Sequence, residues 1–254
     1  MLPRIIFKYK PIMFNEMDFQ KIQEVYEGNK CDFDNSNYKY ISEILEEHKL
    51  YCPTRNELND PFEALQFRLY GNAVAGGSLY SSNRELPPHY EELLSKYRIL
   101  SLTDNAKSPV MWGLYANNYN GVCIGFKTDG TFNNIKHVTY VKENEEVPEC
   151  WFSDPNLLKI IRDSFYKKFK CWENESEYRI IQEEKYLCFD KNEIELLVIG
   201  HNVSEKYKNK LTDICEKQGI PAYYTYLDKV RRKVLFKEIQ FQKIYDGEEI
   251  ETDF

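Results

Sequence analysis

The sequence has no long apolar segment and no N-terminal sorting signal. A membrane-spanning helix requires a run of about 18 apolar residues, and the 254 residues contain no such run. The first residues, MLPRIIFKYK, have neither the apolar core nor the small-residue cleavage site of a signal peptide. We therefore expect a cytoplasmic protein without a membrane partner.

Cysteine and histidine occur without the spacing that a disulfide framework or a metal site needs. The seven cysteines are odd in number and include no Cys-x-x-Cys pair, and the four histidines show no ligand spacing. The sequence also lacks a phosphate-binding loop that ends in Gly-Lys-Ser or Gly-Lys-Thr, and it lacks a Gly-x-Ser-x-Gly elbow. These absences predict reduced thiols and no bound metal.

Acidic and aromatic residues are abundant instead. Asp and Glu total 41 against 34 Lys and Arg, which gives a net charge of −7, and aromatic residues make up 15% of the chain. An acidic chain is a poor candidate for non-specific nucleic-acid binding, because that binding needs clustered cations. A chain so rich in aromatic residues is not disordered.

Short apolar runs and amphipathic segments alternate irregularly, which predicts an α+β fold. We expect a mixed, mainly antiparallel sheet with flanking helices, in a single domain over residues 1–254. One strand–helix–strand unit is expected near the C-terminus, where Ser204 begins a helix and Gly219 ends it. Strands are expected at 38–41, 50–52, 98–103, 121–126, 138–141, 178–181, 194–199, 220–226 and 234–241.

Helices are expected where apolar residues recur at helical spacing. The expected segments are 15–28, 42–49, 89–97, 109–116, 155–170 and 204–218. The fifth of these helices would place Leu158, Ile161, Phe165 and Phe169 on its apolar face. Its last turn would contain Lys167, Lys168 and Lys170.

Three carboxylates at a spacing of two are the first candidate site. On an extended segment Glu173, Glu175 and Glu177 would share one face, where their mutual repulsion would raise the pKa of at least one of them. Such a group suits general acid–base chemistry or the stabilisation of a cationic transition state. Arg179 continues the same face and would pair with Glu177. The alternative interpretation is a solvated edge strand with one ion pair.

Other segments are weaker candidates. Ser101 and Thr103 would present both hydroxyls on one strand face. The Asn59–Glu63 segment is typical of a turn, with a ligand contact as the alternative. Trp112 and Tyr115 are three residues apart on a short helix, where core packing is the commoner role.

A small basic cluster, Lys229-Val-Arg-Arg-Lys233, lies between two expected strands. It would contact phosphate or form a solvated strand entrance.

Several blocks in order resemble a bacterial and phage-associated family known as domain of unknown function 2971. The blocks are Leu58–Glu63, Leu100–Thr103, Met111–Ala116, Gly121–Phe126, Val138–Tyr140, Lys170–Arg179 and Val198–Gly200. The resemblance covers about residues 37–226. It leaves an N-terminal helical segment, 1–36, and a C-terminal strand with an acidic tail, 227–254. It implies a phage-defence or toxin-like effector.

The order of the motifs is also similar to that of ADP-ribosyltransferases. In that resemblance Tyr38 and Tyr40 stand on the first strand, Ser101 and Thr103 on the Ser-x-Thr strand, and Glu175 and Glu177 at a Glu-x-Glu segment. It implies that Glu177 supports an oxocarbenium-like ribose and that Glu175 acts on the acceptor. The remaining residues assigned to cofactor or substrate binding are Trp112, Tyr115, Asn59, Asp60, Trp172 and Arg179.

Three functions therefore remain open. The first is an NAD-consuming ADP-ribosyltransferase or glycohydrolase, with NAD as substrate and a protein or nucleic-acid acceptor. The second is a metal-dependent nuclease or hydrolase in which Asp60, Glu63, Glu175 and Glu177 converge on Mg²⁺. The third is a non-enzymatic sensor or partner-binding module with a cleft lined by Trp112, Tyr115, Trp172 and Tyr178.

Overall fold

The computed structural model describes residues 2–12, 37–64, 68–70, 88–142, 149–151 and 155–240. The helix expected at 15–28 lies outside these residues. The chain forms two compact units. Unit 1 contains residues Met1–Leu50, Leu102–Asn133 and Cys188–Phe254, and unit 2 contains Tyr51–Ser101 and Asn134–Leu187. Helices and a mainly antiparallel sheet confirm the α+β class.

Unit 1 contains a sheet with the strand order β14-β13-β12-β5-β1-β4. The strands are β1 (Ile5–Pro11), β5 (Gly121–Lys127), β12 (Ile194–Ile199), β13 (Ala222–Asp228), β14 (Lys233–Glu238) and the last two residues of β4 (Arg98–Thr103). The pairs β1–β4, β1–β5, β12–β5 and β13–β14 are antiparallel. β1 has no counterpart among the strands expected from the sequence, although its lysines alternate with apolar residues.

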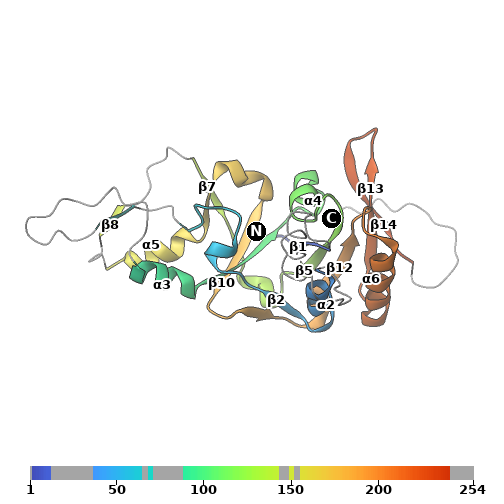
Figure 1. Ribbon diagram of the computed structural model, residues 1–254, viewed down its shortest axis with the longest axis horizontal. Coiled ribbons are helices and arrows are strands. Elements are labelled where there is room, and N and C mark those ends of the chain that lie inside the picture. Colours follow the sequence, from blue (N-terminus) through green and yellow to red (C-terminus); the bar gives the residue numbers. More distant parts are fainter. Residues whose placement is uncertain are drawn as a thin grey trace, which may run out of the picture. The chain divides into compact units, whose positions relative to one another are not determined.

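The expected strand–helix–strand unit is confirmed in unit 1. β12 and β13 are parallel, and α6 (Glu205–Gln218) connects them. The helix ends where Gly219 adopts a φ of 71°, a left-handed conformation that favours glycine. Figure 1 shows α6 beside β13 and β14, and the turn between these two strands extends beyond the helix.

The strand expected at 38–41 is wrong, because this segment begins the helix α2 (Tyr38–Glu46). Its buried residues Ile41, Ile44 and Leu45 follow helical spacing, so the segment covers apolar surface as a helix. α2 packs on α6, with the Tyr38 and Tyr207 rings 5.5 Å apart.

The helix α4 (Pro109–Leu114) covers one face of the unit 1 sheet. Ser108 begins this helix by accepting a hydrogen bond from the Met111 N–H, and Pro109 takes the first helical position, as expected. The buried cluster beneath it contains Phe7, Tyr9, Ala106, Met111, Trp112, Ala116, Cys123, Leu196, Val198, Tyr223, Val234 and Phe236. The members of this cluster are apolar and aromatic side chains.

Unit 2 has the strand order β4-β10-β6, formed with the first four residues of β4. Its other strands form parallel pairs, β3 with β8 and β7 with β9. The bounds are β3 (Arg68–Tyr70), β6 (Lys136–His137), β7 (Thr139–Val141), β8 (Glu149–Trp151), β9 (Lys167–Phe169) and β10 (Glu177–Gln182). The helices are α3 (Pro88–Lys96) and α5 (Leu157–Ser164), and the 3-10 helices include η1 (Arg55–Glu57) and η3 (Lys170–Glu175).

The remaining short elements are β2 (Lys49–Tyr51), β11 (Tyr186–Cys188), η2 (Thr131–Asn134) and η4 (Lys191–Glu193). β2 and β11 form a two-stranded sheet. Within the described residues, no helix is long and apolar enough to cross a membrane.

The helix expected at 155–170 is too long. α5 ends at Ser164, and the chain then enters β9, so Lys167, Lys168 and Phe169 are in a strand and not in a last helical turn. Leu158 is exposed, so it does not belong to the apolar face. That face packs through Leu157, Ile161 and Phe165 into a cluster with Ala64, Leu94 and Ile99.

Candidate functional site

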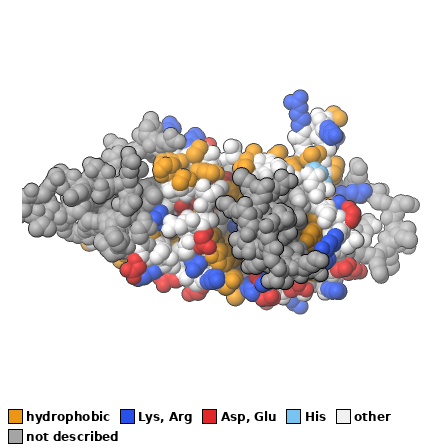
Figure 2. All heavy atoms as spheres, in the orientation of Figure 1, with side chains coloured by type: hydrophobic (Ala, Val, Ile, Leu, Met, Phe, Trp, Pro, Cys, Tyr) orange, Lys and Arg blue, Asp and Glu red, His pale blue; other side chains and the backbone are white. Residues whose placement is uncertain are grey.

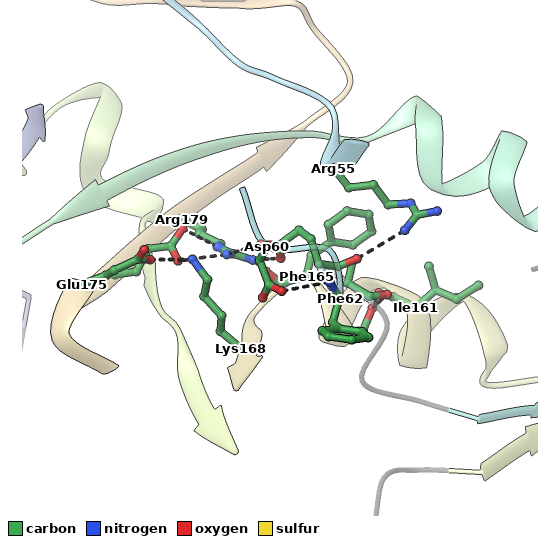
Figure 3. Close-up of polar contacts among 12 residues, drawn as sticks. Arg55, Asp60, Phe62, Ile161, Phe165, Lys168, Glu175 and Arg179 are labelled. Carbon is green, nitrogen blue, oxygen red and sulfur yellow. Dashed lines mark hydrogen bonds and ion pairs between the residues drawn. The ribbon is translucent and has the colours of Figure 1, made fainter. Parts of the chain in front are cut away.

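Five charged side chains form a buried network inside unit 2 (Figure 3). We call it the charge network, and it consists of Glu63, Lys168, Glu175, Glu177 and Arg179. All five residues are buried. They come from four segments: the turn before β3, strand β9, the end of η3 and strand β10. Because buried titratable groups with perturbed pKa values cluster at functional sites, the charge network is the candidate site.

The turn that carries Glu63 is shaped by Asp60, as expected from the sequence. Asp60 Oδ1 accepts a hydrogen bond from the Phe62 N–H at 2.9 Å, and the Glu63 N–H donates to the Asp60 carbonyl at 3.2 Å. Arg55 Nη1 lies 3.5 Å from the Glu63 carbonyl oxygen. Figure 3 shows these contacts beside the Arg179 and Lys168 side chains. The turn thus fixes the position from which Glu63 reaches Arg179.

Arg179 is at the centre of the charge network and is fully buried. Its guanidinium binds both oxygens of Glu63, at 2.5 and 2.9 Å, and both oxygens of Glu177, at 2.7 and 2.9 Å. Nη1 also donates to the Phe165 carbonyl at 2.7 Å. These bonds use all five N–H donors of the guanidinium. Paired bidentate contacts of this kind fix geometry as well as charge.

Lys168 is the second cation of the charge network. Its Nζ lies 2.5 Å from Glu175 Oε2 and 3.3 Å from Glu177 Oε2. The same Nζ lies 4.7 Å from the centroid of the Trp172 ring. Burial lowers the pKa of Lys168, but Glu177 and Glu175 outweigh it, so the pKa is raised. Lys168 therefore stays charged in the interior.

Glu177 stays ionised in the same environment. Burial raises its pKa, but Arg179, Lys168 and the Ser101 hydroxyl lower it more, and the result is a pKa of about 2. The Glu177 N–H donates to the Tyr140 hydroxyl at 2.8 Å. The expected pairing of Arg179 with Glu177 is confirmed. The structure also brings the Ser101 hydroxyl of β4 to the Glu177 carboxylate.

Glu63 and Asp60 are the two buried acidic residues of the turn before β3. Burial raises the pKa of Glu63 in spite of its contacts with Arg179. Glu63 therefore accepts a proton more readily than an ordinary glutamate does. Asp60 Oδ2 is buried and has no hydrogen-bond partner among the described residues. A buried oxygen of this kind is an acceptor that a ligand donor could use.

The expectation that Glu173, Glu175 and Glu177 share one strand face is wrong. Lys170–Glu175 forms the 3-10 helix η3, and Ser176 then takes a left-handed conformation with a φ of 45°. The side chains of the three glutamates therefore do not alternate as they would along a strand. Glu173 is exposed and lies 3.9 Å from Lys170, whereas Glu175 and Glu177 are buried. The alternative of a solvated edge strand is also wrong, because β10 lies between β4 and β6.

The other expected site residues that lie in unit 2 differ in exposure. Asn59 is exposed, and Trp172 is half-buried over Lys168. Tyr178 is buried and lies against His137, with ring centroids 4.8 Å apart. Of the residues expected to bind the cofactor, unit 2 contains Ser101.

Five residues expected to bind the cofactor lie in unit 1: Tyr38, Tyr40, Thr103, Trp112 and Tyr115. Tyr38 and Tyr40 are on α2 and not on a first strand, and Tyr40 is exposed. Trp112 is fully buried, and its Nε1 donates to the Ala106 carbonyl at 2.8 Å. The Thr103 hydroxyl accepts a hydrogen bond from the Asn105 N–H at 3.2 Å.

Lys168 and Tyr140 were not among the expected site residues. Lys168 was expected in the last turn of a helix, and Tyr140 in a strand. A usable signal was the presence of three glutamates within ten residues of Lys168, since a buried carboxylate needs a cation.

A metal site is not formed by the charge network as it stands. Within the described segments, no group of three or more His, Cys, Asp or Glu side chains could hold a metal ion. Arg179 and Lys168 occupy the positions between Glu63, Glu175 and Glu177. The Mg²⁺ hypothesis gains no support from this geometry.

No family model, curated protein or solved structure matches the chain. The resemblance to domain of unknown function 2971 therefore stays a prediction.

Proposed function

We propose that the protein consumes NAD, as an ADP-ribosyltransferase or NAD glycohydrolase with an effector role in bacterial phage defence. The observation that carries this proposal is the contact between the Ser101 hydroxyl and the Glu177 carboxylate. It places the first residue of the Ser-x-Thr segment beside the Glu-x-Glu segment within unit 2, and this supports the order of motifs in the resemblance. A fixed, ionised carboxylate is also what stabilises an oxocarbenium-like ribose.

The proposal assigns distinct roles to neighbouring groups. Glu177 supplies the negative charge that faces the ribose, and Arg179 and Lys168 keep it ionised. Ser101 orients that carboxylate, and Glu175 acts on the acceptor. The unpaired Asp60 Oδ2 accepts a hydrogen bond from the nicotinamide carboxamide, which is a donor of the right kind.

The test is release of nicotinamide from NAD. We expect the wild type to release it and Ser101→Ala to release it about 10- to 100-fold more slowly, because the variant loses a hydrogen bond to a charged group. Glu177→Gln should abolish release. Glu173→Gln is the matched control, because Glu173 is exposed in the same segment and should change nothing.

Folding is followed in parallel by near-UV circular dichroism, since Glu177→Gln disturbs two buried cations. No release by the wild type would contradict the proposal. Equal release by the wild type and a folded Glu177→Gln variant would contradict it as well.

A second candidate is a non-enzymatic binding module. It is favoured because every N–H donor of the Arg179 guanidinium already has an acceptor. All five donors of Arg179 are used, and both Glu177 oxygens accept hydrogen bonds from cations. Such an arrangement suits a rigid scaffold that positions a binding surface. In this case Ser101→Ala would leave cellular activity unchanged, and the wild type would release no nicotinamide.

A further inference from the structure

The β13–β14 hairpin of unit 1 has two chemically different faces. Tyr223, Thr225, Val234 and Phe236 are buried, and three of them belong to the apolar cluster under α4. Because side chains alternate along a strand, the residues between them point to the other face. That face contains the cross-strand pairs Tyr224 with Lys237, Tyr226 with Leu235, and Asp228 with Lys233.

Helix α6 covers this outer face near its base. Lys208 of α6 lies 5.6 Å from the centroid of the Tyr224 ring. Farther along the hairpin, Tyr226 is 39% exposed and Lys233 is exposed, and Lys237, opposite Tyr224, is exposed as well. Figure 1 shows that the hairpin continues beyond α6 at this end. We call Tyr226, Lys233 and Lys237, together with the turn 229–232, the hairpin surface.

The turn concentrates positive charge in a chain whose net charge is −7. Lys229, Arg231 and Arg232 are exposed there, and Figure 2 shows Lys and Arg side chains on the projecting hairpin. Asp228 is the acidic residue next to them. Its Oδ1 accepts hydrogen bonds from the N–H groups of Val230 and Arg231, and its Oδ2 lies 3.7 Å from Arg231 Nε, so its carboxylate shapes the turn and partly balances one of the cations.

We propose that the hairpin surface binds single-stranded nucleic acid. The five cations of the surface, Lys229, Arg231, Arg232, Lys233 and Lys237, match the charge of a phosphate backbone. Tyr226 presents an aromatic ring between them, and aromatic rings among cations form the platforms on which unpaired bases stack. This inference does not depend on the proposed reaction with NAD.

Two other polyanionic partners fit the hairpin surface less well. A membrane would require the exposed apolar groups to share one inserting face, but Tyr226 and Leu227 are neighbours on a strand and point to opposite faces. A nucleic-acid duplex keeps its bases stacked on one another, so Tyr226 would have no base to receive.

The experiment measures binding of fluorescent oligo(dT) and oligo(U) of about 20 nucleotides, a length that exceeds the usual site size of one small domain. We expect the logarithm of the affinity to fall with the logarithm of salt concentration with a slope of about −3.5, because each of five phosphate contacts on a single strand contributes about −0.7. Arg231→Glu with Arg232→Glu should abolish binding. Lys217→Glu, which alters an exposed cation of α6, is the matched control.

The aromatic contribution is tested at Tyr226. We expect Tyr226→Ala to weaken binding about tenfold, and Tyr226→Phe to preserve it because the ring remains. Tyr226 is exposed, so neither change should affect folding. Any of three results would overturn the proposal: no oligonucleotide binding by the wild type, tighter binding to a duplex of the same length, or binding confined to vesicles that contain phosphatidylserine.

Discussion

The interiors of the two units contain different kinds of side chain. In addition to its apolar cluster, unit 2 buries three carboxylates and two cations joined by directional bonds, whereas the cluster under α4 in unit 1 is apolar and aromatic. A buried ion pair costs desolvation, so its net contribution to stability is small while its demand for complete pairing is large. Apolar burial stabilises in proportion to the area removed from water. Unit 2 should therefore be sensitive to the loss of a single charge, and unit 1 to the loss or addition of volume.

Unit 1 has a geometric constraint of its own. Asn117, Asn118 and Tyr119 all have a left-handed φ, between 45° and 64°. Such residues are strained and persist where their surroundings fix them. The Tyr119 carbonyl accepts a hydrogen bond from the Asn202 N–H at 3.2 Å, and the Gly200 N–H donates to the Gly121 carbonyl at 2.9 Å. Backbone hydrogen bonds fix the geometry of this turn, whereas ion pairs fix the geometry of the charge network in unit 2.

The largest effect is expected from Arg179→Met. The change leaves Glu63 and Glu177 buried without their shared cation, so we expect the free energy of unfolding to fall by about 3–5 kcal/mol. Urea denaturation followed by circular dichroism measures it. The control is Lys170→Met, which removes an exposed cation 3.9 Å from Glu173 and should cost at most about 1 kcal/mol. Equal losses in the two variants would show that the charge network does not hold unit 2 together.

The second-largest effect is expected to be a loss of folding stability at acid pH. In the folded protein the pKa of Glu177 is about 2, below its ordinary value of 4.5, so the folded state releases this proton more readily. Its stabilisation is present above the ordinary pKa and is lost as the pH falls toward the folded value. Glu63 responds in the opposite sense, because its pKa is raised and its protonation favours the folded state.

We therefore expect the urea concentration at the midpoint of unfolding to decrease as the pH is lowered from about 5 to about 2. The decrease should be smaller than Glu177 alone would cause, because protonation of Glu63 acts in the opposite direction. The dependence should be flatter in Glu177→Gln and unchanged in Glu173→Gln. The same slope in both variants would contradict the assignment of the acid response to Glu177.

Much of the fold could be predicted from the sequence, because apolar runs determine buried strands directly. The strands at 98–103, 121–126 and 194–199 and the helix that ends before Gly219 agree with the structure. The error at 38–41 arose because a short aromatic run does not distinguish a strand from a helix. The longer pattern of Ile41, Ile44 and Leu45 was the better guide.

The candidate site could be predicted only where it is local. Arg179 and Glu177 are two residues apart on β10, so strand alternation was sufficient to pair them. Glu63 reaches Arg179 from a turn more than a hundred residues earlier, which no local pattern encodes. The left-handed Ser176 removed Glu173 from the expected face, and a non-glycine residue in that conformation is not visible in the sequence.

A smaller loss is expected in unit 1 from Gly200→Ala. A Cβ atom at this position would overlap the Tyr119 carbonyl oxygen and lie 3.0 Å from the Gly121 carbonyl oxygen. Both obstacles are backbone atoms, so the strained turn would have to move. We expect the free energy of unfolding to fall by about 1–3 kcal/mol, as in other overpacked sites. Amide hydrogen exchange should show the loss of protection concentrated at 117–121 and 200–203, and unchanged protection there would contradict the constraint.

The smallest effect, and one of opposite sign, is expected from Gly113→Ala. Gly113 lies within α4, and a Cβ atom there would meet its nearest neighbour, Asn118 Oδ1, at an ordinary contact distance of 3.9 Å. Alanine restricts the unfolded chain more than glycine does, so the free energy of unfolding should rise by about 0.4–1 kcal/mol in urea denaturation. Because Gly113 and Gly200 both belong to unit 1, this pair of variants separates the addition of a methyl group from the displacement of backbone. If Gly113→Ala destabilised the protein as much as Gly200→Ala, unit 1 would be intolerant of added volume in general, and the left-handed turn would not be its specific constraint.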